Sequence, residues 1–90
     1  MNVNGPRIFI VSDSIGETAE KVVKAVAIQF NSDITEIRKE ANVTDKSQIV
    51  RIVEEAKNYN SIVVYTIVLP ELKKTLEEEC DRYGIPRVDI

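Results

Sequence analysis

Residues 7–26, RIFIVSDSIGETAEKVVKAV, change from apolar to polar to amphipathic within one short stretch. The apolar run at 8–11 is rich in β-branched residues, which is typical of a strand buried on both faces. From Thr18 onward, apolar residues recur at the spacing of one helix face, and Asn31 begins the polar segment that ends the helix. That face is predicted to consist of Ala19, Val22, Val23, Val26, Ala27 and Phe30. The stretch therefore predicts an inner strand, a polar turn and a surface helix.

Residues 34–43 predict a second strand of a different kind, because apolar and charged residues alternate along it. Charges on one face suit the edge of a sheet better than its centre. One face is predicted to hold Thr35, Ile37, Lys39, Ala41 and Val43. Asp45 and Gln48 have the spacing of a capping box, which predicts that a second helix begins beside them.

Residues 61–68, SIVVYTIV, form the most apolar run in the chain and predict a second central strand. Pro70 suits the first turn of a third helix, and Gly84 is placed to end it. Residues 85–90, IPRVDI, begin a fourth strand. The alternation of strands and helices continues to the last residue.

The order β-α-β-α-β-α-β predicts an α/β fold with a parallel sheet, right-handed crossovers and helices on both faces. With the two apolar strands inside, we expect a three-layer α/β/α, Rossmann-like domain whose four-stranded sheet has the order 2-1-3-4. Residues 1–90 are predicted to form this single domain. No helix follows the fourth strand, so we expect the chain to be the N-terminal fragment of a longer, two-domain protein.

The composition excludes several classes of function. Fifteen acidic and twelve basic residues give a net charge of −3 with no Lys or Arg block, which argues against nucleic-acid and membrane binding. No apolar run approaches the roughly twenty residues of a membrane span, and one cysteine favours the cytoplasm. The chain has no histidine and no Gly-x-x-x-x-Gly-Lys-Ser/Thr loop, so we predict no catalytic residue and no metal ligand.

The polar turn after the first strand is the candidate site. In parallel sheets ligands bind at the carboxyl ends of the strands, where successive connections diverge to opposite faces. In the order 2-1-3-4 this point lies between strands one and three. It would place Ser12, Asp13, Ser14 and Gly16 on one side and Thr66 on the other.

The same turn has a purely structural interpretation. Ser14 and Glu17 match the Ser-x-x-Glu capping box, in which both side chains serve the start of the helix and neither needs a ligand. The carboxylates of Asp13 and Glu17 would also repel a bare phosphate. A ligand here would therefore be a Mg²⁺-bound anion, a hydroxyl or amine donor, or a basic segment of a partner.

The segments VSDSIGETAE and YTIVLPELKKTLEEECDRYGIPRVDI resemble the bifunctional regulatory proteins of pyruvate, phosphate dikinase and phosphoenolpyruvate synthase. The resemblance covers residues 8–90. It implies that the family's conserved turn corresponds here to Ser12, Asp13, Ser14, Gly16, Glu17 and Thr18. Ile15 departs from the small or hydroxyl residue that many members have at its position.

The resemblance implies an ADP-dependent serine/threonine kinase that inactivates the target enzyme by phosphorylating a threonine. It also implies a phosphate-dependent pyrophosphorylase that reverses this modification. The family's phosphate-binding loop lies in a later C-terminal domain, so ADP and Mg²⁺ are implied for the full-length protein, and we expect neither to bind this fragment tightly. The fragment alone is expected to be inactive.

Two other functions fit the same residues. The domain could be a non-catalytic module for homodimerisation or target docking, or a stand-alone binder of a small polar ligand at Asp13. Neither the target enzyme, the oligomeric state nor the nucleotide-site residues follow from the sequence.

Overall fold

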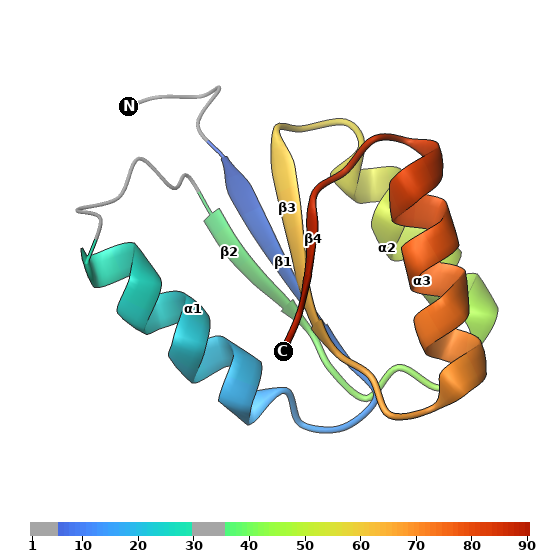
Figure 1. Cartoon of the computed structure of the whole chain (residues 1–90), viewed down its shortest axis with the longest axis horizontal. Helices are drawn as coiled ribbons and strands as arrows, with labels where there is room; N and C mark the ends of the chain where they lie inside the picture. Colours follow the sequence, from blue (N-terminus) through green and yellow to red (C-terminus); the bar gives the residue numbers. More distant parts are fainter. Residues whose placement is uncertain (1–5, 30–35) are drawn as a thin grey trace.

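The computed structural model describes residues 6–29 and 36–90, and strands alternate with helices as predicted (Figure 1). The elements are β1 (Arg7–Ser12), α1 (Glu17–Gln29), β2 (Glu36–Glu40), α2 (Lys46–Ala56), β3 (Ser61–Thr66), α3 (Pro70–Arg82) and β4 (Arg87–Asp89). The predicted helix end at Asn31 and the predicted role of Phe30 lie outside the described residues. No helix of the described ranges is long and apolar enough to cross a bilayer.

The four strands form one parallel sheet in the order β2-β1-β3-β4, which confirms the predicted topology. β1 and β3 lie side by side along their whole length, from the pair Arg7 and Ser61 to the pair Ser12 and Thr66. The carboxyl ends of the two inner strands are therefore neighbours. This register decides which polar residues meet at that edge of the sheet.

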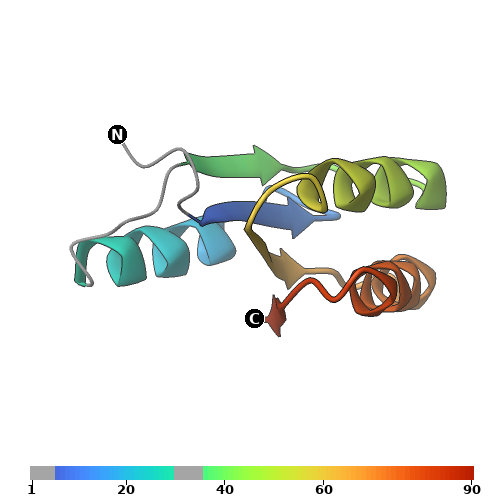
Figure 2. The same cartoon turned by 90° about the horizontal axis from the view of Figure 1, so that it is seen from above.

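The helices lie on both faces of the sheet, with α1 on one side and α2 and α3 on the other (Figures 1 and 2). Because side chains alternate along a strand, Phe9 and Val11 join the core under α2 and α3, whereas Ile8 and Ile10 face α1. Both sets are buried. This burial on two faces explains why β1 carries an unbroken apolar run.

The predicted inner face of α1 is only partly correct. Ala19 and Val23 are buried against the sheet, but Val22 is 41% and Val26 45% exposed. The prediction assumed that the whole apolar stripe would be covered. In the structure α1 is the one described helix on its side of the sheet, so the half of its stripe that faces β3 and β4 stays open.

β2 is an edge strand as predicted, and its side chains alternate between the two faces. Lys39 pairs with Glu20 of α1 at 3.1 Å, and Arg38 pairs with Glu55 of α2. Val43, however, was assigned to the face of Ile37 and belongs instead to the core under α2. The strand ends at Glu40 and the chain then turns, so the alternation does not extend to Val43.

Two helix ends are built as the sequence predicts. The Asp45 side chain accepts the Gln48 N–H, and the Gln48 side chain reaches back, which completes the predicted capping box. At the end of α3, Gly84 has φ 66°. The Gly84 and Ile85 N–H groups bond to the carbonyls of Asp81 and Cys80, the pattern of a Schellman motif.

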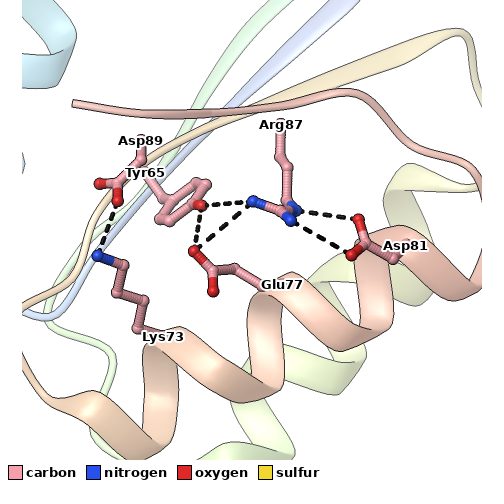
Figure 3. A network of polar contacts seen from close by, with 6 residues as sticks. All are labelled: Tyr65, Lys73, Glu77, Asp81, Arg87 and Asp89. Atoms are coloured by element: carbon pink, nitrogen blue, oxygen red, sulfur yellow. Dashed lines mark hydrogen bonds and ion pairs between the residues drawn. The ribbon is translucent and has the colours of Figure 1, made fainter.

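A polar network holds the short strand β4 against α3 (Figure 3). Its members are Tyr65, Lys73, Glu77, Asp81, Arg87 and Asp89. The buried Tyr65 hydroxyl donates to Glu77 at 2.6 Å and accepts from Arg87 at 3.0 Å. Arg87 also donates two hydrogen bonds to the Asp81 carboxylate, from Nε to Oδ1 at 3.0 Å and from Nη2 to Oδ2 at 3.2 Å. All three residues of β4 are exposed, so the strand buries little apolar surface of its own. The side-chain bonds of Arg87 and Asp89 therefore help to hold it in place.

Tyr65→Phe is expected to lower the free energy of unfolding by about 1 kcal/mol, the usual value of one such hydrogen bond. Burial, followed by the hydrogen bond to Glu77, raises the pKa of Tyr65 from 10 to about 12. The folded state thus favours the neutral phenol. The stability that the neutral Tyr65 side chain contributes is fully present below pH 10 and is lost as the pH rises towards 12. Denaturant unfolding of both proteins should show the stability difference shrinking over that range. A difference that stays constant would contradict the assignment.

Candidate functional site

A cluster of hydroxyl groups lies where β1 and β3 end side by side. Ser12 is fully buried, and its Oγ accepts hydrogen bonds from Thr66 Oγ1 at 3.1 Å and from the Ser14 N–H at 3.0 Å. The hydroxyls of Ser12 and Ser14 are 3.2 Å apart. The structure therefore brings together Ser12 at the end of β1, Ser14 in the turn that follows it, and Thr66 at the end of β3.

Asp13 connects two loops at this edge. Its Oδ2 atom accepts the backbone N–H groups of Val68 at 2.9 Å and Leu69 at 2.8 Å. Hydrogen bonds from N–H groups to a carboxylate are among the stronger ones in proteins. Asp13 thus ties the turn after β1 to the segment that leads from β3 into α3.

The predicted capping box of Ser14 and Glu17 is wrong. α1 begins at Glu17, and the Glu20 N–H bonds to the Gly16 carbonyl at 3.0 Å, which makes Gly16 the N-cap residue. Ser14 lies two residues before the cap, and its own N–H is already bonded to the Ser12 hydroxyl. A local side-chain bond to the backbone has displaced the capping interaction.

Gly16 is required at its position for two reasons. Its φ is 74°, a conformation that side-chain-bearing residues rarely adopt. A Cβ atom at Gly16 would also lie 3.2 Å from the Cβ of Ser12. Glu17 and Thr18, in contrast, are exposed in the first turn of α1, where Glu17 pairs with Lys21 at 3.6 Å. The structure does not join these two residues to the hydroxyl cluster.

A third loop, which the sequence reasoning missed, completes the edge. The Asn42 N–H bonds to the Ser14 carbonyl at 2.8 Å, and the Val43 N–H bonds to the Ser12 carbonyl at 3.0 Å. Asn42 has φ 56°. Asparagine is enriched in this left-handed region, so an Asn two residues after the end of β2 was the signal that could have located the turn.

An open groove of about 710 Å³ lies beside this edge, between the first turns of α2 and α3. Its lining residues are Thr44, Asp45, Lys46, Leu69, Pro70, Glu71 and Leu72. Leu69 connects the groove to the loop that Asp13 holds. The N-cap of α3 makes no side-chain cap bond. The groove is lined mostly by apolar surface and lies next to the loop that Asp13 holds, but Ser12 and Thr66 do not line it.

Mg²⁺ and ADP are the two groups that the family resemblance implies for the full-length protein. Within residues 6–29 and 36–90, no group of three Asp, Glu, Cys or His side chains is arranged to hold a metal ion. Asp13 supplies one carboxylate, and one of its oxygens already accepts two N–H groups. We therefore derive no catalytic step through either group from this chain.

Comparison with known proteins gives consistent matches. The family model described as kinase/pyrophosphorylase matches residues 8–90. A protein of Alkaliphilus oremlandii named pyruvate, phosphate dikinase regulatory protein is 47% identical over 83 residues, covering 92% of this chain and 30% of the relative. A relative of the same name from Alkaliphilus metalliredigens is 43% identical over 90 residues, covering 100% of this chain and 32% of the relative. The chain thus spans about a third of the length of these curated relatives.

Proposed function

The chain belongs to the kinase/pyrophosphorylase family, and from this premise we propose that it is the N-terminal domain of a regulator of pyruvate, phosphate dikinase or phosphoenolpyruvate synthase. The whole protein would phosphorylate a threonine of its target with ADP and remove that phosphate with inorganic phosphate. The observation that carries the proposal is the family match over residues 8–90. The names of the relatives, pyruvate, phosphate dikinase regulatory protein, support the choice of target.

We propose that the carboxyl edge of the sheet is the functional surface of this domain. Three loops are joined there by the hydrogen bonds of Ser12, Asp13 and Ser14. Such an edge forms one wall of the cleft in many parallel α/β proteins. The role of this chain would be to position a target segment or a neighbouring domain, while the nucleotide chemistry belongs to residues that the chain does not contain.

The 90-residue chain alone is expected to show no ADP-dependent phosphorylation of a dikinase, because its sequence has no Gly-x-x-x-x-Gly-Lys-Ser/Thr loop and its described residues contain no group of three metal-ligating side chains. The measurement is phosphothreonine on the dikinase by mass spectrometry, with ADP as the donor. The longer protein that begins with this chain is the positive control. Phosphorylation by the isolated chain at a rate near that of the longer protein would overturn the proposal that it is inactive alone.

A second function, docking without any contribution to the cleft, is favoured by one observation. Ile15, Val68 and Leu69 are 64%, 83% and 50% exposed at the same edge of the sheet. Exposed apolar side chains in one region are typical of contact surfaces. Binding of the dikinase by the 90-residue chain, together with full activity of the longer protein after substitution of Ser12 and Asp13, would favour this docking role.

A further inference from the structure

The side of the sheet that carries α1 contains an open apolar groove. It has a volume of about 220 Å³ and lies between α1 and the strands β3 and β4. Ile8 and Val64 form its floor, and both are buried in the core beneath α1. Its rim consists of Val22, Val26, Val88 and Ile90, each between 41% and 46% exposed.

On the opposite face of the sheet, two helices cover the strands. There α2 and α3 lie together over the sheet, and Val63 and Tyr65 beneath them are 0% exposed (Figure 2). On the α1 side one helix covers the same four strands within the described residues. The groove lies where a second helix would complete the layer. A continuous apolar patch of this kind marks a contact surface.

We propose that this groove is filled by an amphipathic helix from the polypeptide that follows residue 90 in the full-length protein. The chain spans only 30% to 32% of its curated relatives, so a protein of the relatives' length would have enough residues to supply such a helix. Ile90 itself lines the groove, and its N–H continues the ladder by bonding to the Tyr65 carbonyl at 3.0 Å. Whatever follows residue 90 therefore starts beside the groove.

The handedness of the connections narrows the choice of helix. A right-handed crossover towards the β4 edge runs over the face of α2 and α3, as the connection from β3 to β4 does. A connection from β4 to a further strand outside it would follow the same face. The helix in the groove is therefore one that does not lead to a further strand outside β4, because the handedness rule applies only to a helix that connects two parallel strands of one sheet. This inference requires a longer chain but no particular catalytic activity.

Thiol labelling of two single substitutions tests the proposal. Val26→Cys places a thiol on the rim of the groove, and Ile28→Cys places one on the same helix at a position that is 81% exposed and outside the groove. The native Cys80 is fully buried, and burial raises its pKa to about 11, so it contributes little background. Modification rates are measured by mass spectrometry in the 90-residue chain and in the longer protein.

We expect the thiol at position 26 to react about tenfold more slowly in the longer protein than in the 90-residue chain, and the thiol at position 28 equally in both. Val22→Cys is a second rim variant in case the first does not fold. Equal rates at both rim positions in the two proteins would overturn the proposal. Protection of the rim in the 90-residue chain that increases with its concentration would also overturn it, because the occupant would then be a second copy. Kinase assays do not enter this test, so its failure is separate from failure of the proposed function.

Discussion

Gly16→Ala is expected to lower the free energy of unfolding by about 2–3 kcal/mol, one of the two largest effects predicted for this chain. Part of the cost is the backbone, because φ at Gly16 is 74° and an alanine is strained in that conformation. The rest is steric, because the new Cβ atom would lie 3.2 Å from Ser12 Cβ. Relief of that contact would displace Ser12, whose hydroxyl organises Ser14 and Thr66.

Gly84→Ala is the matched control for this prediction. Gly84 has φ 66°, so the backbone strain of an alanine there is comparable, but apart from its two chain neighbours no described residue has an atom within 4 Å of the position its Cβ would take. We expect this variant to lose only about 1 kcal/mol. Denaturant unfolding of both variants measures the difference, which isolates the contact with Ser12. Equal losses in the two variants would show that the close approach to Ser12 contributes nothing.

Asp13→Ala is expected to lower the free energy of unfolding by about 2 kcal/mol, because two backbone N–H groups lose a charged acceptor. The effect should be local. Amide hydrogen exchange at Val68 and Leu69 should accelerate, since Asp13 Oδ2 accepts both N–H groups. Asp13→Asn keeps an oxygen at this position without the charge, so about half of the loss should be recovered.

Asp45→Ala provides the control for Asp13. It also removes a carboxylate that accepts a backbone N–H, but at the start of α2. We expect a similar loss of stability with unchanged exchange at Val68 and Leu69. If the carboxyl edge of the sheet is the functional surface, Asp13→Ala should also reduce activity of the longer protein more than Gly84→Ala does, because Gly84 lies between the end of α3 and the start of β4, at the opposite edge of the sheet. Unchanged exchange at Val68 and Leu69 in Asp13→Ala would refute the role given to Asp13.

Local patterns predicted the elements of this fold well where one interaction dominates. The unbroken apolar runs identified β1 and β3 as inner strands because both of their faces are buried. Asp45 and Gln48 predicted the start of α2 because a capping box involves only residues within one turn. Gly84 predicted the end of α3 for the same reason, since the Schellman motif is also local.

The same kind of evidence failed where two interactions compete for one group. Ser14 matched a capping box, but its N–H is held by the Ser12 hydroxyl and the helix starts later, after Gly16. The exposure of Val22 and Val26 could not be predicted from the sequence either. A helical stripe shows which residues are apolar, but it does not show whether another element covers them.

The sequence by itself determined the order of strands and helices, the parallel sheet and the place of its carboxyl edge, because periodicity and connection length act along the chain. Only the tertiary structure decided what Asp13 does there. Its partners are the N–H groups of Val68 and Leu69, more than fifty positions away, and no local pattern records them. The pairing exists because parallel alignment of β1 with β3 brings Ser12 beside Thr66 and so brings the two following loops within hydrogen-bonding distance.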